Sequence, residues 1–100
     1  MDYYQQGDVI LIPVKAIPKD AQPKADKHLA EGELTGHFHA PTARTAQVYE
    51  VKGKRFMSAP RGTSIEHQEH KPIEVPAGEY EVRIVREYSH FDEEAHEVRD

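Results

Sequence analysis

The sequence predicts an all-β protein, a small barrel or sandwich of about eight short strands. Short runs rich in β-branched and aromatic residues alternate with glycine and proline turn signals, at roughly the 8–12-residue spacing typical of such folds. No apolar pattern of helical period is long enough to compete. We expect residues 1–88 to form a single β domain, and residues 89–100 to form an acidic tail that is a short helix or disordered.

The first half of the chain contains one strong strand signal. Residues 8–14 are a nearly continuous apolar run, which predicts a strand buried on both faces with Pro13 at an edge or bulge. Residues 17–24 are polar and contain two prolines, so we expect an exposed loop there. Residues 29–36 have glycines at turn spacing and should link a short strand to the one that carries His37 and His39.

The second half contains the clearest hairpin and strand signals. A loop at residues 41–45 should precede a strand at 46–51, with Lys52-Gly53 as the centre of a tight hairpin that returns through residues 55–57. Residues 60–62 and 75–78 have turn composition. After the first turn, Thr63, Ile65 and His67 share a strand face. The strand after the second turn alternates with period two, and its apolar face consists of Tyr80, Val82, Ile84 and Tyr88.

Composition excludes several classes of protein. The formal net charge is −5 and the pI is about 5.8, which argues against nucleic-acid binding because such proteins usually carry a basic face. No apolar run approaches the roughly 18 residues of a membrane span, and residues 1–6 show no signal-peptide pattern. With no cysteine, a cytoplasmic location is the simplest expectation.

Two histidine couplets, His37-Phe38-His39 and His67-Gln68-Glu69-His70, predict a metal site. Positions i and i+2 of a strand face the same side, so His37 and His39 can present both rings to one point. Positions i and i+3 do not, so His67 and His70 converge if the chain turns between them. The most economical ligand set is His37, His39 and His67, with His70 as a fourth ligand on a bend or as a group behind the ligands.

Imidazole ligands suit Zn, Fe, Mn, Ni or Cu, and the sequence does not choose among these divalent metals. Three imidazoles would leave coordination positions open for water or substrate. Carboxylates near the couplets are available to ligate the metal or to orient the imidazoles: Glu31, Glu33, Glu66 and Glu69. The isolated histidines are expected to be solvated or hydrogen-bonded: His28, His90 and His96.

The histidines do not fit the better-known catalytic motifs. There is no His-Glu-x-x-His, no phosphate-binding glycine loop and no Gly-x-Ser-x-Gly. Gln47 and Glu50 stand where the deubiquitinase-type metalloprotease pattern has serine and aspartate, and Pro41 stands where histidine-triad hydrolases have a third histidine. The substrate and the reaction, if there is one, therefore stay open.

Several segments together resemble a set of short uncharacterised bacterial and phage-encoded proteins. The resemblance implies that the histidines at 37, 39 and 70 belong to a site, and it brings no assigned activity. The segments are Gln6-Gly7-Asp8-Val9, residues 29–33, Thr35-Gly36-His37-Phe38-His39, Glu69-His70-Lys71-Pro72-Ile73, Pro76-Ala77-Gly78-Glu79-Tyr80-Glu81-Val82 and Arg86-Glu87-Tyr88.

The histidine pattern also resembles the cupins, small β-barrels that carry His-x-His in a first motif and a further histidine after a Pro-x-Gly turn. His37 and His39 match the pair, and residues 60–62 precede His67. The glutamate of the cupin pattern falls on Ala43 or Arg44, and His67 lies two residues late. The resemblance implies a loosely cupin-like barrel with a metal.

Two main functions are compatible with these observations. The first is a small β-barrel that binds a divalent metal through its histidine cluster. The alternative is a non-enzymatic interaction or structural module, such as a phage structural or operon-accessory protein, with histidine-rich recognition loops. A pH-responsive histidine cluster is a third possibility.

A partner chain is also expected. Hydrophobic residues make up 37% of the chain, and a strand that is apolar on both faces should leave a sheet edge or an apolar patch uncovered. We therefore expect a homo-oligomer, most simply a two-fold dimer, although an unidentified protein partner would cover the same surface.

Overall fold

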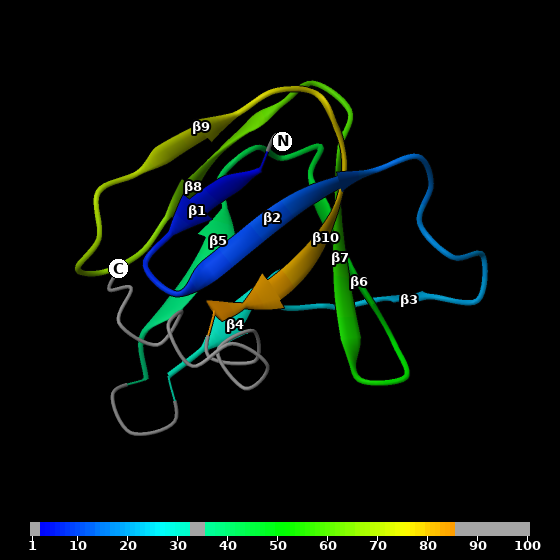
Figure 1. The fold of residues 1–100 in the computed structure, drawn as a ribbon, viewed down its shortest axis with the longest axis horizontal. Helices are drawn as coiled ribbons and strands as arrows, with labels where there is room; N and C mark the ends of the chain where they lie inside the picture. Colours follow the sequence, from blue (N-terminus) through cyan, green and yellow to red (C-terminus); the bar gives the residue numbers. More distant parts are fainter. Residues whose placement is uncertain (1–2, 33–35, 86–100) are drawn as a thin grey trace.

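A computed structural model describes residues 3–32 and 36–85, and over these ranges the chain is all-β with no helix (Figure 1). Ten short strands form two antiparallel sheets. The larger sheet has the order β1 (Tyr4–Gln6), β2 (Val9–Val14), β10 (Gly78–Ile84), β7 (Lys54–Ala59), β6 (Gln47–Val51) and β3 (Gln22–Pro23). The smaller has the order β4 (Ala30–Glu31), β5 (Phe38–Pro41), β8 (Thr63–Glu66) and β9 (Ile73–Val75).

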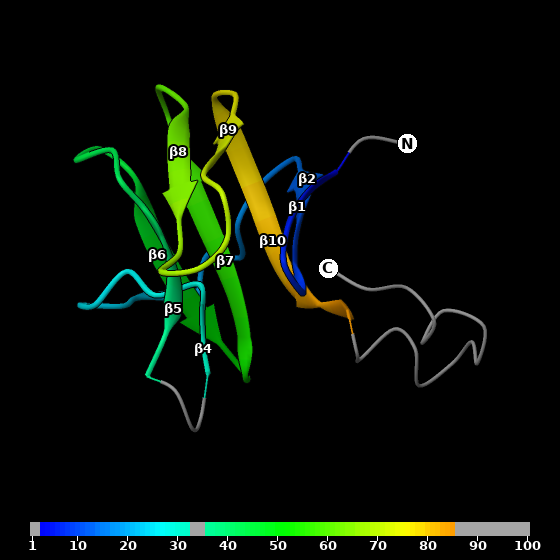
Figure 2. The same cartoon turned by 90° about the vertical axis from the view of Figure 1, so that its left-hand side faces the viewer.

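The sandwich alternative therefore describes this fold, and the closed barrel is not formed. Closure would require hydrogen bonds between the outermost strands, whereas the described strands divide into two sheets with separate edges (Figure 2). The sequence predicted about eight strands, fewer than the ten found in the described residues. The difference arises because the two-residue strands β3 and β4 are too short to give a periodic signal. β3 also lies inside the segment expected to be a loop. The acidic tail lies outside the described residues, as does Tyr88.

The strand predicted to be buried on both faces is β2. Val9, Ile10 and Leu11 are all buried, so successive side chains on opposite faces are both covered. On one side Pro13 pairs with Tyr80 of β10. On the other side the pairing with β1 reaches only as far as Leu11, so Pro13 has no partner in β1. Its missing N–H is tolerated because β1 does not extend alongside it.

The hairpin predicted at Lys52-Gly53 joins β6 and β7. Both residues have positive φ, 52° and 79°, and they separate the paired residues Val51 and Lys54. Positive φ at both central positions is the signature of a type I′ turn, whose twist matches that of the flanking strands. This local turn chemistry confirms the prediction.

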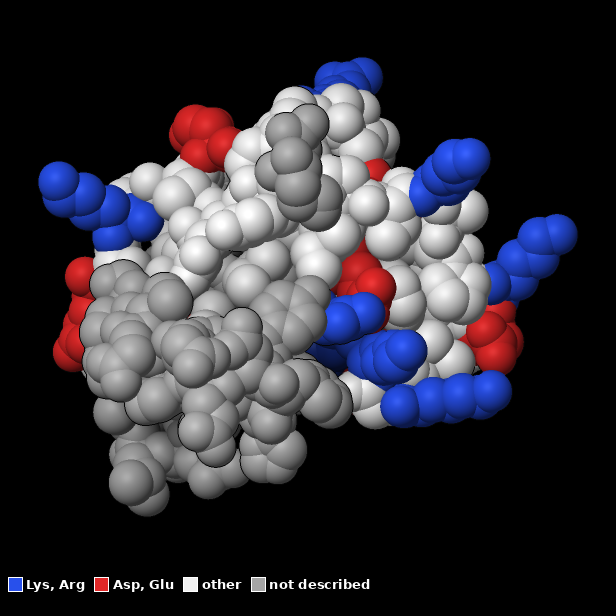
Figure 3. All heavy atoms as spheres, viewed as in Figure 1, with Lys and Arg blue, Asp and Glu red and all other residues white. Residues whose placement is uncertain are grey.

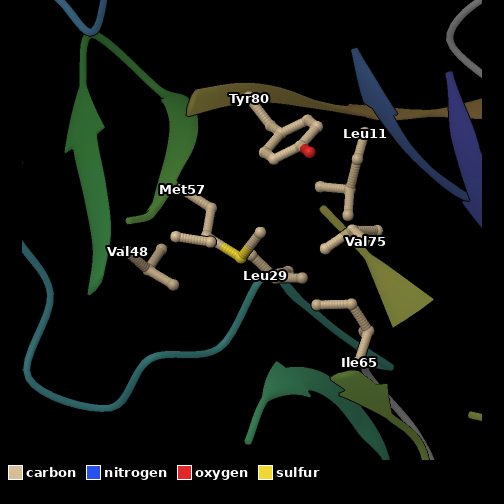
Figure 4. Packing of buried hydrophobic residues seen from close by; sticks show 8 residues of the cluster. Leu11, Leu29, Val48, Met57, Ile65, Val75 and Tyr80 are labelled. Atoms are coloured by element: carbon tan, nitrogen blue, oxygen red, sulfur yellow. The ribbon is translucent and has the colours of Figure 1, made fainter. Parts of the chain in front are cut away.

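The core lies between the two sheets, which both contribute side chains to it (Figure 4). β2, β6, β7 and β10 supply residues from the larger sheet, and β8 and β9 supply them from the smaller. The largest buried side chains, each less than 2% exposed, are Leu11, Leu29, Met57, Ile65, Val9 and Val48. The hydroxyl of Tyr80 donates to Pro76 O at 2.6 Å, so this aromatic ring is buried with its polar end satisfied.

The surface carries charges of both signs. On the face shown in Figure 3, Lys and Arg side chains are interspersed with Asp and Glu. Among the described residues, no helix is long and apolar enough to cross a membrane.

Candidate metal centre

The two histidine couplets meet at one end of the smaller sheet. His37 immediately precedes β5 and His39 lies within it, and His67 and His70 lie in the loop after β8. β5 and β8 pair antiparallel with Ala40 opposite Glu66, so the couplets continue from adjacent strands. The ring centroid of His67 lies 4.3 Å from that of His39, 5.5 Å from that of His37 and 4.6 Å from that of His70.

The convergence of His67 and His70 depends on a turn, as the spacing required. The Nδ1 atom of His67 accepts hydrogen bonds from the amide of Glu69 at 2.9 Å and the amide of His70 at 3.3 Å. This is the pattern by which an Asx side chain closes a turn, here made by an imidazole. Gln68 fixes the loop further, because its Oε1 accepts from the Phe38 amide at 2.9 Å. The turn thus holds the second couplet against β5.

His39 is the most enclosed of the four histidines. It is 5% exposed, and its Nδ1 lies 2.8 Å from Oε1 of the buried Gln6. The Nε2 of Gln6 donates to the carbonyls of Ile65 and Lys71, at 2.9 and 2.8 Å, which fixes the orientation of the amide. His39 therefore carries its proton on Nδ1 and donates it to Gln6. The lone pair is on Nε2.

The Nε2 atom of His39 faces a carboxylate. Asp8 Oδ1 lies 3.8 Å away, at the turn between β1 and β2. The pKa of His39 is lowered to about 4, mainly by burial; the charges of His67 and His70 act in the same direction, and Asp8 opposes them. At neutral pH the imidazole is uncharged, so two electron-pair donors face one another across this gap. A Zn²⁺ ion bonds imidazole nitrogen and carboxylate oxygen at about 2.0–2.2 Å each, so one ion can reach both atoms.

The other two histidines line the same region. His70 packs against Gly7, where an added Cβ would lie 2.5 Å from its Nε2. Gly7 has a φ of +60° and takes the first position of the two-residue turn that holds Asp8. His37 Nδ1 lies 3.8 Å from a carboxylate oxygen of the exposed Glu69. Burial lowers the pKa of His67, and the charges of His70 and His37 contribute in the same direction.

The carboxylates suggested from the sequence are not gathered at this cluster. Glu69 is beside His37, whereas Glu66 is exposed on β8. Glu31 lies on β4 and pairs with Arg55 at 3.0 Å and with His28 at 3.2 Å. Glu33 lies outside the described residues.

A second group of side chains could hold a metal ion: Asp26, His28 and Glu31. Within residues 3–32 and 36–85, this is the group of three whose ligand atoms all lie within 4.8 Å of one another. Its side chains already have partners. Lys24 lies 3.5 Å from Asp26, Arg55 lies 3.0 Å from Glu31, and the ring of His28 stacks on Phe38 at 4.0 Å.

Sequence reasoning missed this group because His28 looked isolated. Asp26-x-His28-x-x-Glu31 is the signal that was available, although such spacing is common on polar loops. It also missed Gln6 and Asp8, which lie far from the couplets in sequence. Their signal was the segment Gln6-Gly7-Asp8-Val9, which belongs to the resemblance described above.

The comparisons with known proteins identify a family without assigning an activity. The family model described as Domain of unknown function (DUF8820) matches residues 5–85. The chain belongs to this family. No curated protein and no solved structure matches the chain. The DUF8820 match agrees with a resemblance to uncharacterised proteins and gives no support to the cupin resemblance. It spans Gln6, Asp8 and the four clustered histidines.

Proposed function

We propose that this DUF8820 protein binds one divalent transition-metal ion at the histidine cluster. The observation that carries the proposal is the geometry of His39. Its Nδ1–H is held by Gln6, and its Nε2 lone pair faces the Asp8 carboxylate at 3.8 Å. Metal-bound histidines typically donate their other ring N–H to a neighbouring acceptor in this way, which fixes the tautomer and the ring orientation.

His39 and Asp8 supply two ligands in this proposal. His70 and His37 are half-buried in the same cluster, and a rotation of their side chains would let them complete the coordination. A mixed set of imidazole and carboxylate suits Zn, Fe, Mn, Ni or Cu, and it leaves room for water or another small ligand. The protein supplies a site held between two sheets, with Gln6 as the residue that positions His39.

The group at Asp26, His28 and Glu31 is the competing location. It is more exposed, and its two carboxylates are paired with Lys24 and Arg55. A metal there would have to displace those cations. The buried His39 instead contacts the neutral amide of Gln6 and the carboxylate of Asp8, so the histidine cluster is favoured.

The test is metal binding by tag-free protein, measured by elemental analysis and by titration calorimetry with Zn²⁺, Co²⁺, Ni²⁺ and Mn²⁺. We expect one equivalent of metal in the parent protein and in His28→Ala, which removes the competing group. Asp8→Asn should weaken affinity at least ~10-fold, because even partners behind metal ligands contribute ~10–100-fold. Asp8 is half exposed, so this variant should fold.

His39→Asn provides a second variant. Its amide N–H can still donate to Gln6, but the Nε2 donor is gone, so binding should be lost with little change in the local hydrogen bonds. Absence of metal binding by the parent protein would overturn the proposal. So would loss of binding in His28→Ala together with retention in Asp8→Asn and His39→Asn, which would assign the metal to the other group.

A further inference from the structure

The first strand forms one edge of the larger sheet. In the part of the chain that the structure describes, β1 ends this sheet and pairs with β2 (Figure 1). The Val85 amide donates to the Asp8 carbonyl, so the even-numbered residues of β2 direct their backbone groups toward β10. The odd-numbered residues of β2 therefore face β1, where they lie opposite Tyr4 and Gln6. Between these two, Gln5 directs its backbone N–H and C=O away from β2.

The smaller sheet lies against one face of β1 and leaves the other face to solvent. On the covered face, the side chain of Gln6 donates to the carbonyls of Ile65 and Lys71. Tyr3 and Gln5 alternate with Gln6 and belong to the opposite face, and Tyr3 is 50% exposed. Extending the alternation by one residue gives the backbone of Tyr3 the same outward direction as that of Gln5. The edge of β1 thus presents two uncharged residues, each with an N–H.

The two shortest edge strands carry residues that oppose strand addition. On β3, the Lys24 amide donates inward to Val48 O, so the outward-facing residue is Pro23, which has no N–H. By the same reasoning, the outward-facing residue of β4 is Glu31, whose carboxylate pairs with Arg55 at 3.0 Å. A strand added to either edge would meet a missing donor or an ion pair.

The edge formed by β9 is protected along its whole length. The Thr42 amide donates to Ser64 O, which directs the even-numbered residues of β8 toward β5 and leaves the odd-numbered ones to β9. Glu74, at the centre of β9, therefore faces outward and is exposed. The next outward positions on either side are Pro72 and Pro76, neither of which has an N–H. Among the described strands, β1 is thus the edge with neither a proline nor a charge at its outward positions.

We infer that the edge of β1 is an interface that pairs antiparallel with β1 of a second copy of this chain, about a two-fold axis at Tyr4. In this register Tyr3 of each copy lies opposite Gln5 of the other, so the outward-facing N–H and C=O groups of both residues gain partners. Tyr4 lies opposite Tyr4 of the second copy, a favourable aromatic pair. The inference goes beyond the proposed metal binding and does not depend on it.

Charge and closure both favour a second copy as the occupant of this edge. Residues 3–7 carry no charge, so two identical edges can face each other without like-charge repulsion. Pairing of β1 with another described edge of a copy would meet Pro23, Glu31 or the prolines that flank Glu74. Such head-to-tail pairing would also leave an edge open for further addition. Pairing of β1 with β1 uses the open edge of both copies, so the assembly closes at two subunits.

The experiment exchanges charges across the inferred interface in the full chain. Sedimentation velocity is measured over a range of concentrations with a chelator present, so that metal binding does not enter. Tyr3→Lys/Gln5→Lys and Tyr3→Glu/Gln5→Glu each place like charges opposite one another twice in the dimer. We expect each variant alone to dimerise at least about 10-fold more weakly than the parent protein.

An equimolar mixture of the two variants should recover the dimer, because each lysine then lies opposite a glutamate. This recovery also shows that both variants fold. Gln22→Lys is the matched control, because it adds a charge on β3, the opposite edge of the same sheet, where the side chain is exposed. It should leave dimerisation unchanged.

Three results would overturn the inference. The first is a parent protein that stays monomeric at millimolar concentration; protection of the Gln5 amide from hydrogen exchange in that monomer would assign the edge to another segment of the same chain. The second is a parent dimer that both charged variants form equally well, which would place the interface elsewhere. The third is the absence of association in the mixture while both variants keep the circular dichroism of the parent protein, which would refute the antiparallel register.

Discussion

The buried His39 should make metal-free protein lose stability in mild acid. The pKa of this imidazole is lowered from its ordinary value of 6.5 to about 4, mainly by burial. Between these two values the unfolded chain binds a proton that the folded protein does not, so the free energy of unfolding increases with pH. The stabilisation is fully present above pH 6.5 and is lost as the pH falls toward 4.

The difference between these pKa values corresponds to about 3 kcal/mol, because each tenfold change in proton affinity is worth about 1.4 kcal/mol. The free energy of unfolding of a typical domain is about 5–15 kcal/mol, so this contribution is a large part of it. His67 contributes in the same direction, because its pKa is also lowered. Acid between pH 6.5 and 4.5 should therefore weaken the fold strongly.

The assay is urea denaturation with a chelator present, at pH 7.5, 6.5, 5.5 and 4.5, for the parent protein and His39→Asn. The variant keeps an N–H donor for Gln6 but cannot titrate at this position. We expect the parent protein to lose about 2–3 kcal/mol more than the variant over this range. Equal pH dependence in the two proteins would refute the assigned burial and tautomer of His39.

Three further outcomes follow from the packing and the sheet edges. Gly53→Ala should lower the free energy of unfolding by about 1 kcal/mol, because the residue has a positive φ. Gly7→Ala should lower it by more, because the added Cβ would also lie 2.5 Å from His70 Nε2. Equal losses for the two variants in chemical denaturation would contradict this. Met57→Ala, at a fully buried position, should cost about 2–5 kcal/mol of unfolding free energy, and a loss below ~1 kcal/mol would argue against this core. Light scattering at micromolar concentration should give at least twice the 11.4 kDa monomer mass, and a mass near the monomer would refute the predicted homodimer.

Local patterns were sufficient to predict much of the fold. The apolar run of β2, the Lys52-Gly53 hairpin and the alternation of β10 depend on neighbouring residues, and each was predicted from the sequence. The choice between barrel and sandwich was not predictable in this way. It depends on which edge strands share hydrogen bonds, and that pairing joins residues far apart in the chain.

For the candidate site, too, the sequence determined some features and the tertiary structure decided the others. The sequence by itself determined that four histidines occur in two couplets near strand ends, and that His67 and His70 can converge only if the chain turns between them. The pairing of β5 with β8 decided that the couplets meet. Tertiary packing alone brought Gln6 and Asp8 from the first hairpin to His39. Hydrogen bonds then set opposite tautomers in His39 and His67, because a ring's proton position depends on the partner that packing supplies.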